Sequence, residues 1–321
     1  MDYILLIVGF ILLIKGADIF VDAASKIAKR IGIPSIIVGL TIVSLGTSAP
    51  ELAVSLISAI NGTSDIAIGN VLGSNLFNSL MVLGGTAVVV PLLFKKATVK
   101  RDYIVNFVVT VILFILAFGI TLNDNYLSRI DGIILLILCV AYITYLVYVV
   151  KKSNNLDETE EEKESRKEVN VVKNIILAII GVVGIVFGGD LVVDSASNIA
   201  TSLGMSSKLV GLTIVAMGTS LPELVTSIVA ALKGEKDIAL GNVLGSNIFN
   251  ILLILGTSSA ICPFAVDPVL AVDFIILIGI TILIGVLIFA NKKKEKNFTR
   301  VEGLLLVAIY IFYLIYVIMR N

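Results

Sequence analysis

The stretch GTSAPE at residues 46–51 places a proline and a carboxylate inside an apolar segment, and it returns as GTSLPE at residues 218–223. A carboxylate in such surroundings is costly and by default marks a functional site. The proline lacks an N–H and crowds the carbonyl four residues before it, so the helix loosens there. Because Glu51 follows Thr47 by one helical turn, their side chains share a face. Each copy therefore predicts carboxylate, hydroxyl and freed carbonyl oxygens that point into a protein-enclosed cavity.

Both stretches belong to a long internal repeat. Residues 38–78 align with residues 210–250 without a gap, and 27 of the 41 positions are identical. Shared hydrophobicity alone would not produce that identity. The alignment continues upstream, pairing Asp18 with Asp190, Asp22 with Asp194, and Gly32 with Gly204. The chain is therefore predicted to contain one structural unit used twice.

The composition predicts a membrane protein. Of 321 residues, 58% are hydrophobic and 15% charged, and the mean hydropathy is +1.06. A soluble domain rarely has so little charge, and a helix needs about 20 apolar residues to cross a bilayer. Ten segments meet that length: 4–28, 35–60, 66–92, 104–122, 130–150, 173–200, 207–232, 238–262, 269–290 and 301–319. The predicted fold class is all-α integral membrane, with ten transmembrane helices.

The distribution of basic residues predicts the topology. If successive loops alternate sides, 20 of the 24 Lys and Arg residues fall on one side of the membrane. The positive-inside rule makes that side cytoplasmic and places both termini outside. The first segment lacks the basic start and cleavage site of a secretory signal, so we expect it to remain as a transmembrane helix.

A charged linker divides the chain into two domains. Residues 1–150 form the first predicted five-helix repeat, residues 151–172 a solvated cytoplasmic linker, and residues 173–321 the second repeat. Because five spans is an odd number, the second repeat enters the membrane with the opposite orientation. Inverted repeats are typical of secondary transporters, whose sites lie at the repeat interface near the midplane.

A polar stripe follows each buried glutamate. Its members recur at a spacing of four residues in the third and eighth spans: Asn70, Ser74 and Asn78, then Asn242, Ser246 and Asn250. Such residues can simply hold helices together, but their symmetric placement favours a ligand role. We therefore predict that helices 2 and 7, and also 3 and 8, are discontinuous and form a central cation site.

The pooled groups at this site are all oxygen ligands. Hard cations such as Ca²⁺ take about 6–8 oxygens at about 2.3–2.6 Å, and two ionised glutamates neutralise one divalent cation. Na⁺ can compete for the same carboxylates, which would couple opposite fluxes. The chain has no histidine, and Cys139 and Cys262 lie in apolar segments, which argues against zinc and redox chemistry. No cofactor is expected, and Ca²⁺ and Na⁺ are the expected transported ions.

Other interpretations stay open from the residues alone. Buried glutamates also bind protons, so H⁺/Ca²⁺ exchange is an alternative. A channel is disfavoured because channels usually build pores by oligomeric symmetry or selectivity rings. An enzyme is disfavoured because no nucleophile or catalytic metal pattern joins the carboxylates. Four further acids either pair with neighbouring groups, with Lys15 a candidate in the first span, or line an ion path: Asp18, Asp22, Asp190 and Asp194.

The motif pair GTSAPE…GNVLGSNLFN and GTSLPE…GNVLGSNIFN resembles the alpha repeats of the calcium/cation antiporter superfamily, most closely its prokaryotic sodium/calcium exchanger branch. The resemblance covers all ten spans. It implies four core helices around the site, past which the first and sixth spans slide to alternate access. The ion ligands that it implies are Glu51 and Glu223 at the centre, oxygens of Thr47, Ser48, Thr219, Ser220, Ser74 and Ser246, the backbone carbonyls of Ser44 and Ala216, and the amides of Asn78 and Asn250.

One departure from the family pattern concerns the middle of the site. Some members carry an aspartate where this chain has Asn78 or Asn250, so this site has two formal negative charges and not three. That leaves open the ion stoichiometry and any potassium co-transport. No eukaryote-type regulatory domain fits between the halves, so the resemblance implies a prokaryotic plasma membrane. The expected partners are the two ions and the lipid bilayer, with no nucleic acid, and one chain is expected to function as a monomer.

Overall fold

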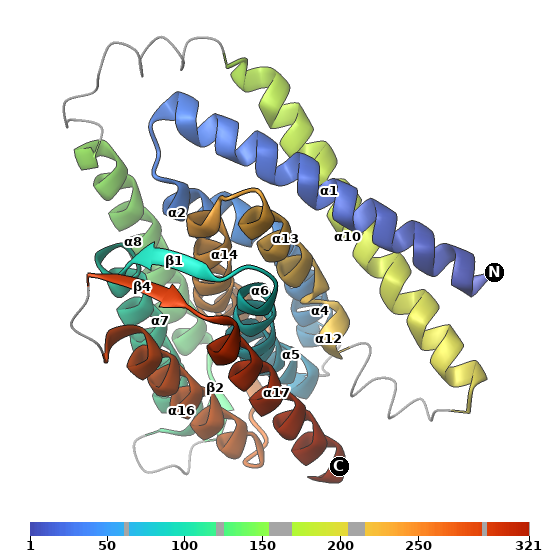
Figure 1. Cartoon of the computed structure of the whole chain (residues 1–321). Coiled ribbons are helices and arrows are strands. Elements are labelled where there is room, and N and C mark those ends of the chain that lie inside the picture. The colour runs from blue at the N-terminus through green and yellow to red at the C-terminus, as the bar shows by residue number, and fades with distance from the viewer. Residues whose placement is uncertain (61–63, 120–124, 154–168, 205–215, 291–293, 321) are drawn as a thin grey trace.

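The computed structural model describes residues 1–60, 64–119, 125–153, 169–204, 216–290 and 294–320. Within them the protein is a bundle of long helices (Figure 1). Among the described residues, eight helices are long and apolar enough to cross a membrane, and one bent pair makes a ninth. The predicted all-α membrane fold is thereby confirmed. Ten spans remain a prediction, because residues 207–215 of the seventh segment lie outside the described residues, as do residues 154–168 of the predicted linker.

Four helices present apolar side chains on the outside of the bundle: α7 (Lys96–Phe118), α8 (Arg129–Ser153), α16 (Leu270–Phe289) and α17 (Arg300–Arg320). Ile137 in α8 is 61% exposed and Phe312 in α17 is 72% exposed. So much exposed apolar surface suits lipid and not water. We therefore interpret these helices as lipid-facing spans.

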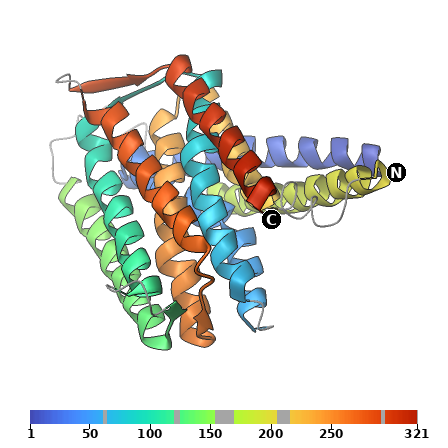
Figure 2. The ribbon, with the colours of Figure 1, turned by 90° about the horizontal axis from the view of Figure 1, so that it is seen from below.

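The helices α1 (Asp2–Ile31) and α10 (Val171–Ser202) pack along each other and run crosswise to the other helices (Figure 2). Glycines bring the two backbones close together. A Cβ on Gly16 would lie 2.7 Å from the backbone N of Ile185, and one on Gly188 would lie 2.5 Å from that of Leu13. Small residues permit this approach in membranes. Gly32 follows the last residue of α1, and its φ of 76° suits glycine.

The second span is broken, as predicted. It runs through α2 (Ser35–Val38), the π-helical η1 (Gly39–Val43) and α3 (Ser44–Thr47), then bends by 50° into α4 (Ala49–Ile60). The described part of the seventh span follows the same plan, with α12 (Ala216–Gly218) and α13 (Leu221–Leu232) separated at Thr219 and Ser220.

The third and eighth spans differ from the prediction, because neither is broken. α5 (Ser64–Phe77), η2 (Asn78–Val82) and α6 (Leu83–Val89) form one helix, as do α14 (Lys236–Phe249), η4 (Asn250–Leu255) and α15 (Gly256–Ile261). Each contains a π-helical segment that begins at an asparagine of the polar stripe. No proline interrupts either motif, so the helix axis continues, and an inserted π turn frees backbone groups without a break.

The helix α14 is the centre of the bundle. Its side chains from Ile238 to Phe249 are all buried, and it contacts α2, η1, α7 and α13. A Cβ on Gly241 would lie 2.4 Å from the carbonyl oxygen of Ile36, and one on Gly245 would lie 2.6 Å from that of Leu40. The second and eighth spans thus cross at backbone contact, which brings their polar residues together.

Two short antiparallel strand pairs join loops that are distant in sequence. β1 (Leu92–Lys95) pairs with β4 (Glu295–Phe298), with Leu92 opposite Phe298. β2 (Tyr126–Leu127) pairs with β3 (Phe264–Ala265). Neither pairing could be predicted from the sequence, because the partners come from opposite halves of the chain.

Candidate cation site

Two glutamates lie at the centre of the site. Glu51 is in the first turn of α4 and Glu223 in the first turn of α13, and both are fully buried. The hydroxyl of Ser220 donates a hydrogen bond of 2.8 Å to Oε1 of Glu51, and that of Ser48 donates one of 2.8 Å to Oε1 of Glu223. Each carboxylate is thus held by a serine of the other sequence repeat, so the two motifs build one site.

The helix breaks explain how the serines reach across. Ser48 has φ −83° and ψ 12°, and Ser220 has φ −95° and ψ 7°, so both leave helical geometry at the same point of the motif. Pro50 and Pro222 follow as the second residues of the new helices. A missing N–H costs nothing in the first turn. The prolines therefore restart each helix with its glutamate and the preceding serine turned toward the partner repeat.

The asparagines at the start of the polar stripe brace these breaks. Asn70 donates to the hydroxyl of Ser55 at 3.0 Å and to the carbonyl of Glu51 at 3.4 Å, and it accepts from Thr219 at 3.4 Å. In the other repeat, Asn242 makes the matching bonds to Ser227, Glu223 and Thr47, at 3.0, 3.3 and 3.2 Å. The hydroxyls of Thr47 and Thr219 are thereby also tied across the repeats.

Several buried polar atoms at the site have no hydrogen-bond partner among the described residues. They are Oε2 of Glu51, Oε2 of Glu223, Oγ of Ser74, both amide atoms of Asn78 and Oδ1 of Asn250. Ser246 is also buried, and its hydroxyl reaches Oε1 of Glu223 at 3.5 Å. Buried oxygens are normally satisfied. This set offers the carboxylate, hydroxyl and amide oxygens that Ca²⁺ and Na⁺ prefer.

The two predicted backbone ligands are the carbonyls of Ser44 and Ala216. The Ser44 carbonyl accepts hydrogen bonds from the N–H of Ser48 at 2.9 Å and from the hydroxyl of Thr47 at 3.3 Å, so its lone pairs are in use. Ala216 is the first described residue of the seventh span, and its side chain lies outside the described part. The structure therefore ties Ser48, Ser220 and Ser246 to the glutamates and leaves the Ser44 carbonyl engaged within its own helix.

The charge of the site is uncompensated in the described part of the chain. No Lys or Arg forms an ion pair with Glu51 or Glu223 there, and no group of three or more His, Cys, Asp or Glu residues gathers. A buried ionised carboxylate without a partner is strongly destabilising. Two of them, with neutral oxygens around them, therefore favour the binding of cations.

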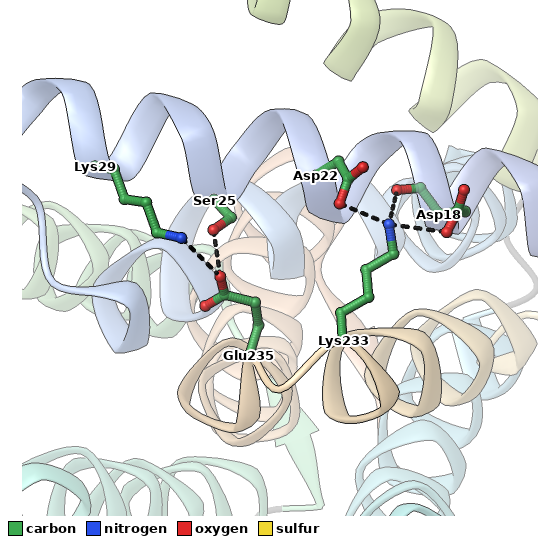
Figure 3. Close-up of polar contacts among 6 residues, drawn as sticks. All are labelled: Asp18, Asp22, Ser25, Lys29, Lys233 and Glu235. Carbon is green, nitrogen blue, oxygen red and sulfur yellow. Dashed lines mark hydrogen bonds and ion pairs between the residues drawn. The ribbon is translucent and has the colours of Figure 1, made fainter. Parts of the chain in front are cut away.

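The acids of α1 and α10 have different environments. Lys233, from the turn between α13 and α14, lies 2.8 Å from Oδ1 of Asp18 and 2.6 Å from Oδ1 of Asp22 (Figure 3). The ion-pair partner of both acids is therefore Lys233 and not the candidate Lys15. Asp190 and Asp194 in α10 are exposed. None of these four acids joins the central site.

A second contact reinforces the attachment of α1. Glu235 accepts a hydrogen bond from Ser25 and lies 3.5 Å from the ammonium of Lys29 (Figure 3). Burial lowers the pKa of Lys233, but the hydrogen bonds and charges of Asp18 and Asp22 outweigh that effect and raise its pKa above the ordinary value. The residues Asp18, Asp22, Ser25, Lys29, Lys233 and Glu235 form what we call the α1 clamp.

Sequence reasoning missed two matching clusters outside the site. In the first, Tyr142 donates to Oδ1 of the buried Asp102 at 3.1 Å, and Arg101 lies 2.7 Å from the same carboxylate. In the second, Tyr313 donates to Asp273 at 3.0 Å, and Arg320 binds it at 2.8 Å. The Asp–Tyr separation is 40 residues in both halves. That equal spacing was the signal in the sequence.

The asparagines that end the two GSN triplets were also missed. Asn75 and Asn247 are buried and meet at the repeat interface, where Asn75 donates to the carbonyl of Asn247 at 3.2 Å. Asn250 donates to Oδ1 of Asn75 at 3.0 Å, and Asn247 donates to Ser79 at 2.9 Å. Each follows a serine of the stripe by one residue and so lies off the face of the stripe. Its role is evident only from the contact between the repeats.

Comparison with known proteins identifies the family of the chain. A model of the sodium/calcium exchanger protein family matches residues 1–151 and 173–319. The candidate antiporter CaxA of Alkalimonas amylolytica is 39% identical over 312 residues, covering 97% of this chain and 96% of that protein. The sodium/calcium exchanger MaX1 of Methanosarcina acetivorans is 36% identical over 295 residues, covering 83% of this chain and 84% of that protein.

The fold is also similar to a solved exchanger structure. The sodium-calcium exchanger NCX_Mj, soaked with 10 mM Na⁺ and zero Ca²⁺, superposes with a TM-score of 0.81 at 32% identity, covering 97% of each chain. These relatives are transporters and not enzymes, and the ions that they carry bind the protein without a cofactor. The chain therefore belongs to the sodium/calcium exchanger family of the calcium/cation antiporters, as a multi-pass membrane protein that transports cations.

Proposed function

We propose that this protein exchanges Na⁺ for Ca²⁺ by alternating access around one site shared by its two repeats. The crossed bonds carry the proposal, because Ser48 holds Glu223 and Ser220 holds Glu51, each at 2.8 Å. A cation between the glutamates would be bound by both repeats at once. The named exchange activities of MaX1 and NCX_Mj support the choice of ions.

The proposed ligands are the predicted ones. The glutamates would supply the charge, and the remaining oxygens would come from Thr47, Ser48, Thr219, Ser220, Ser74, Ser246, Asn78 and Asn250, with the carbonyls of Ser44 and Ala216 on the outer path. In the present conformation the Ser44 carbonyl holds two hydrogen bonds. It would therefore join an ion only after Thr47 turns away.

The same charges account for coupled exchange. Without a cation the site keeps two buried carboxylates that no basic side chain in the described part of the chain neutralises, and moving it between the two sides in that form is costly. One Ca²⁺ or a set of Na⁺ ions removes this penalty. Since both ions need the same two carboxylates, loading one displaces the other, and the two fluxes become opposite and linked.

The strand pairs support ten spans. Paired strands lie on the same side of a membrane, so the chain must cross it an even number of times between them. Between β2 and β3 lie α8, α10 and the α14–α15 helix, which are three spans. An even number supports our proposal that the segment at residues 207–232 is a fourth crossing, although only its residues 216–232 are described. Between β1 and β4 the number of crossings is likewise even only if this segment is counted as a span.

The Asp–Tyr clusters support inverted repeats. Asp102 lies near the start of α7, directly after β1, and Asp273 lies near the start of α16, directly after β3. One span, α16, separates the two strand pairs, so they belong to opposite sides. Equivalent clusters therefore sit at opposite faces, as inversion requires. We propose the repeats at residues 1–150 and 173–321, with both termini outside and residues 151–172 in the cytoplasm.

Calcium uptake into proteoliposomes tests the proposed exchange. Vesicles loaded with Na⁺ are compared with vesicles loaded with choline, each with and without a pH gradient, and Glu51→Gln protein is the control for specific uptake. Uptake that needs internal Na⁺ and ignores the pH gradient is expected. Uptake driven by the pH gradient alone would assign the chain to H⁺/Ca²⁺ exchange, and calcium entry without any counter-gradient would indicate a channel.

A further inference from the structure

The two repeats treat their innermost asparagines differently. Asn250 donates from Nδ2 to Oδ1 of Asn75 at 3.0 Å, so its amide has a fixed orientation and its Oδ1 has no partner in the described part of the chain. Asn78, at the equivalent position, has neither amide atom hydrogen-bonded within that part. Both side chains are fully buried. The difference therefore comes from their neighbours and not from solvent.

One sequence difference accompanies the asymmetry. Asn247 donates to the hydroxyl of Ser79 at 2.9 Å. The position equivalent to Ser79 in the second repeat is Ile251, which cannot accept a hydrogen bond. Asn75 donates instead to the backbone carbonyl of Asn247 at 3.2 Å, and its Oδ1 faces Asn250. Asn75 is thus fixed at both ends of its amide.

We propose that Asn75 is a positioning residue for the cation site, which orients the amide of Asn250 so that its oxygen, and not its nitrogen, is available to the ion. An amide that turns over presents two N–H donors, which repel a cation. Asn75 prevents that by accepting from the nitrogen. The inference rests on the proposed cation site, and it makes Asn250 the preorganised amide ligand and Asn78 the adaptable one.

A double-mutant cycle in calcium binding tests this role. Purified protein in Na⁺-free buffer is titrated with Ca²⁺ by calorimetry for wild type, Asn75→Leu, Asn250→Asp and the double variant. Asn75→Leu should weaken binding by roughly fivefold, since one hydrogen bond that fixes a ligand is lost. In the Asn250→Asp background the same change should cost less than about twofold, because a carboxylate presents an oxygen in either orientation.

A matched cycle at the other repeat provides the control. Asn247→Leu combined with Asn78→Asp should show no coupling, because Asn247 makes no hydrogen bond to Asn78. If Asn75→Leu does not purify as a monodisperse protein, Asn75→Ala replaces it in the same cycle.

Two outcomes would overturn the proposal. Equal losses from Asn75→Leu in both backgrounds would mean a general structural role, and wild-type affinity in Asn75→Leu would mean no role. Glu51→Gln, titrated in the same series, distinguishes a failure of the positioning role from a failure of the proposed cation site. If that variant loses Ca²⁺ while Asn75→Leu keeps it, only the positioning role fails; if it keeps Ca²⁺, the site itself fails and the positioning role with it.

Discussion

The two repeats are alike where they hold the charges of the site and unlike where they meet the rest of the molecule. Ser48 and Ser220 donate to opposite glutamates at the same distance of 2.8 Å. By contrast, the acids of α1 bind Lys233 while those of α10 are exposed. The symmetric serine contacts thus hold the two charges of the site, whereas the Lys233 contacts attach only α1.

The largest effect should come from the glutamates, and it should be the same in both repeats. Glu51→Gln and Glu223→Gln each remove half of the charge that a divalent cation requires, so each should lower Na⁺-dependent Ca²⁺ uptake by at least about 100-fold. Uptake into proteoliposomes measures this, with circular dichroism to show that the helices are intact. Wild-type transport by either variant would mean that the mutated glutamate does not bind the ion and that the two repeats are not equivalent.

The crossed serines should give the next effect. Ser48→Ala and Ser220→Ala each remove a hydrogen bond to a buried carboxylate, which corresponds to about a tenfold loss of Ca²⁺ affinity. Calorimetric titration should give equal losses for the two variants. The control is Ser128→Ala, which lies in the loop before α8 and bonds only locally to Asp131. A large loss for one serine and none for the other would mean that the glutamates are held unequally.

The Asp–Tyr clusters extend the comparison outside the site. Tyr142→Phe and Tyr313→Phe each remove a hydrogen bond to a buried aspartate, at 3.1 and 3.0 Å, so each should lower stability by about 1 kcal/mol. Thermal unfolding in detergent measures this. Ca²⁺ affinity should stay unchanged in both variants, and a loss of affinity in either one would connect that cluster to ion binding.

The α1 clamp should give the smallest effect, and only in one repeat. Lys233→Gln should lower stability by at most about 1 kcal/mol, because its partners are half exposed, whereas Asp190→Asn should change nothing. The pKa of Lys233 is raised on folding, so the contribution is complete below its ordinary value of 10.5 and is lost as the pH rises through the higher folded value. Thermal unfolding at neutral pH and above pH 10.5 tests both statements. Equal effects from Lys233→Gln and Asp190→Asn would contradict the asymmetry.

The site was predictable from sequence where local chemistry and repetition point the same way. Glu51 and Pro50 share one turn, and their recurrence as Glu223 and Pro222 excluded a chance pattern. The break at Ser48 follows from the proline alone. The crossed pairing was not predictable, because it depends on how two helices meet and not on either motif.

The features that sequence reasoning missed are contacts between distant segments. β1 and β4 pair across about 200 residues, and neither strand has a sequence pattern that indicates its partner. Lys233 forms ion pairs with Asp18 and Asp22 because the turn after α13 lies against α1. Lys15 interacts with Asp18 through its charge without forming an ion pair among the described residues. The third span was expected to break like the second, but without a proline Asn78 begins a π turn within a continuous helix.

Equilibrium calcium binding to the purified protein tests the shared site most directly. The stoichiometry is measured by titration for wild type, Glu51→Gln and Glu223→Gln, with Na⁺ as competitor. One Ca²⁺ per chain is expected, displaced by Na⁺ and lost in each single variant. Two Ca²⁺ per chain, or a variant that keeps half of the wild-type binding, would mean that each repeat holds its own ion and would contradict the account.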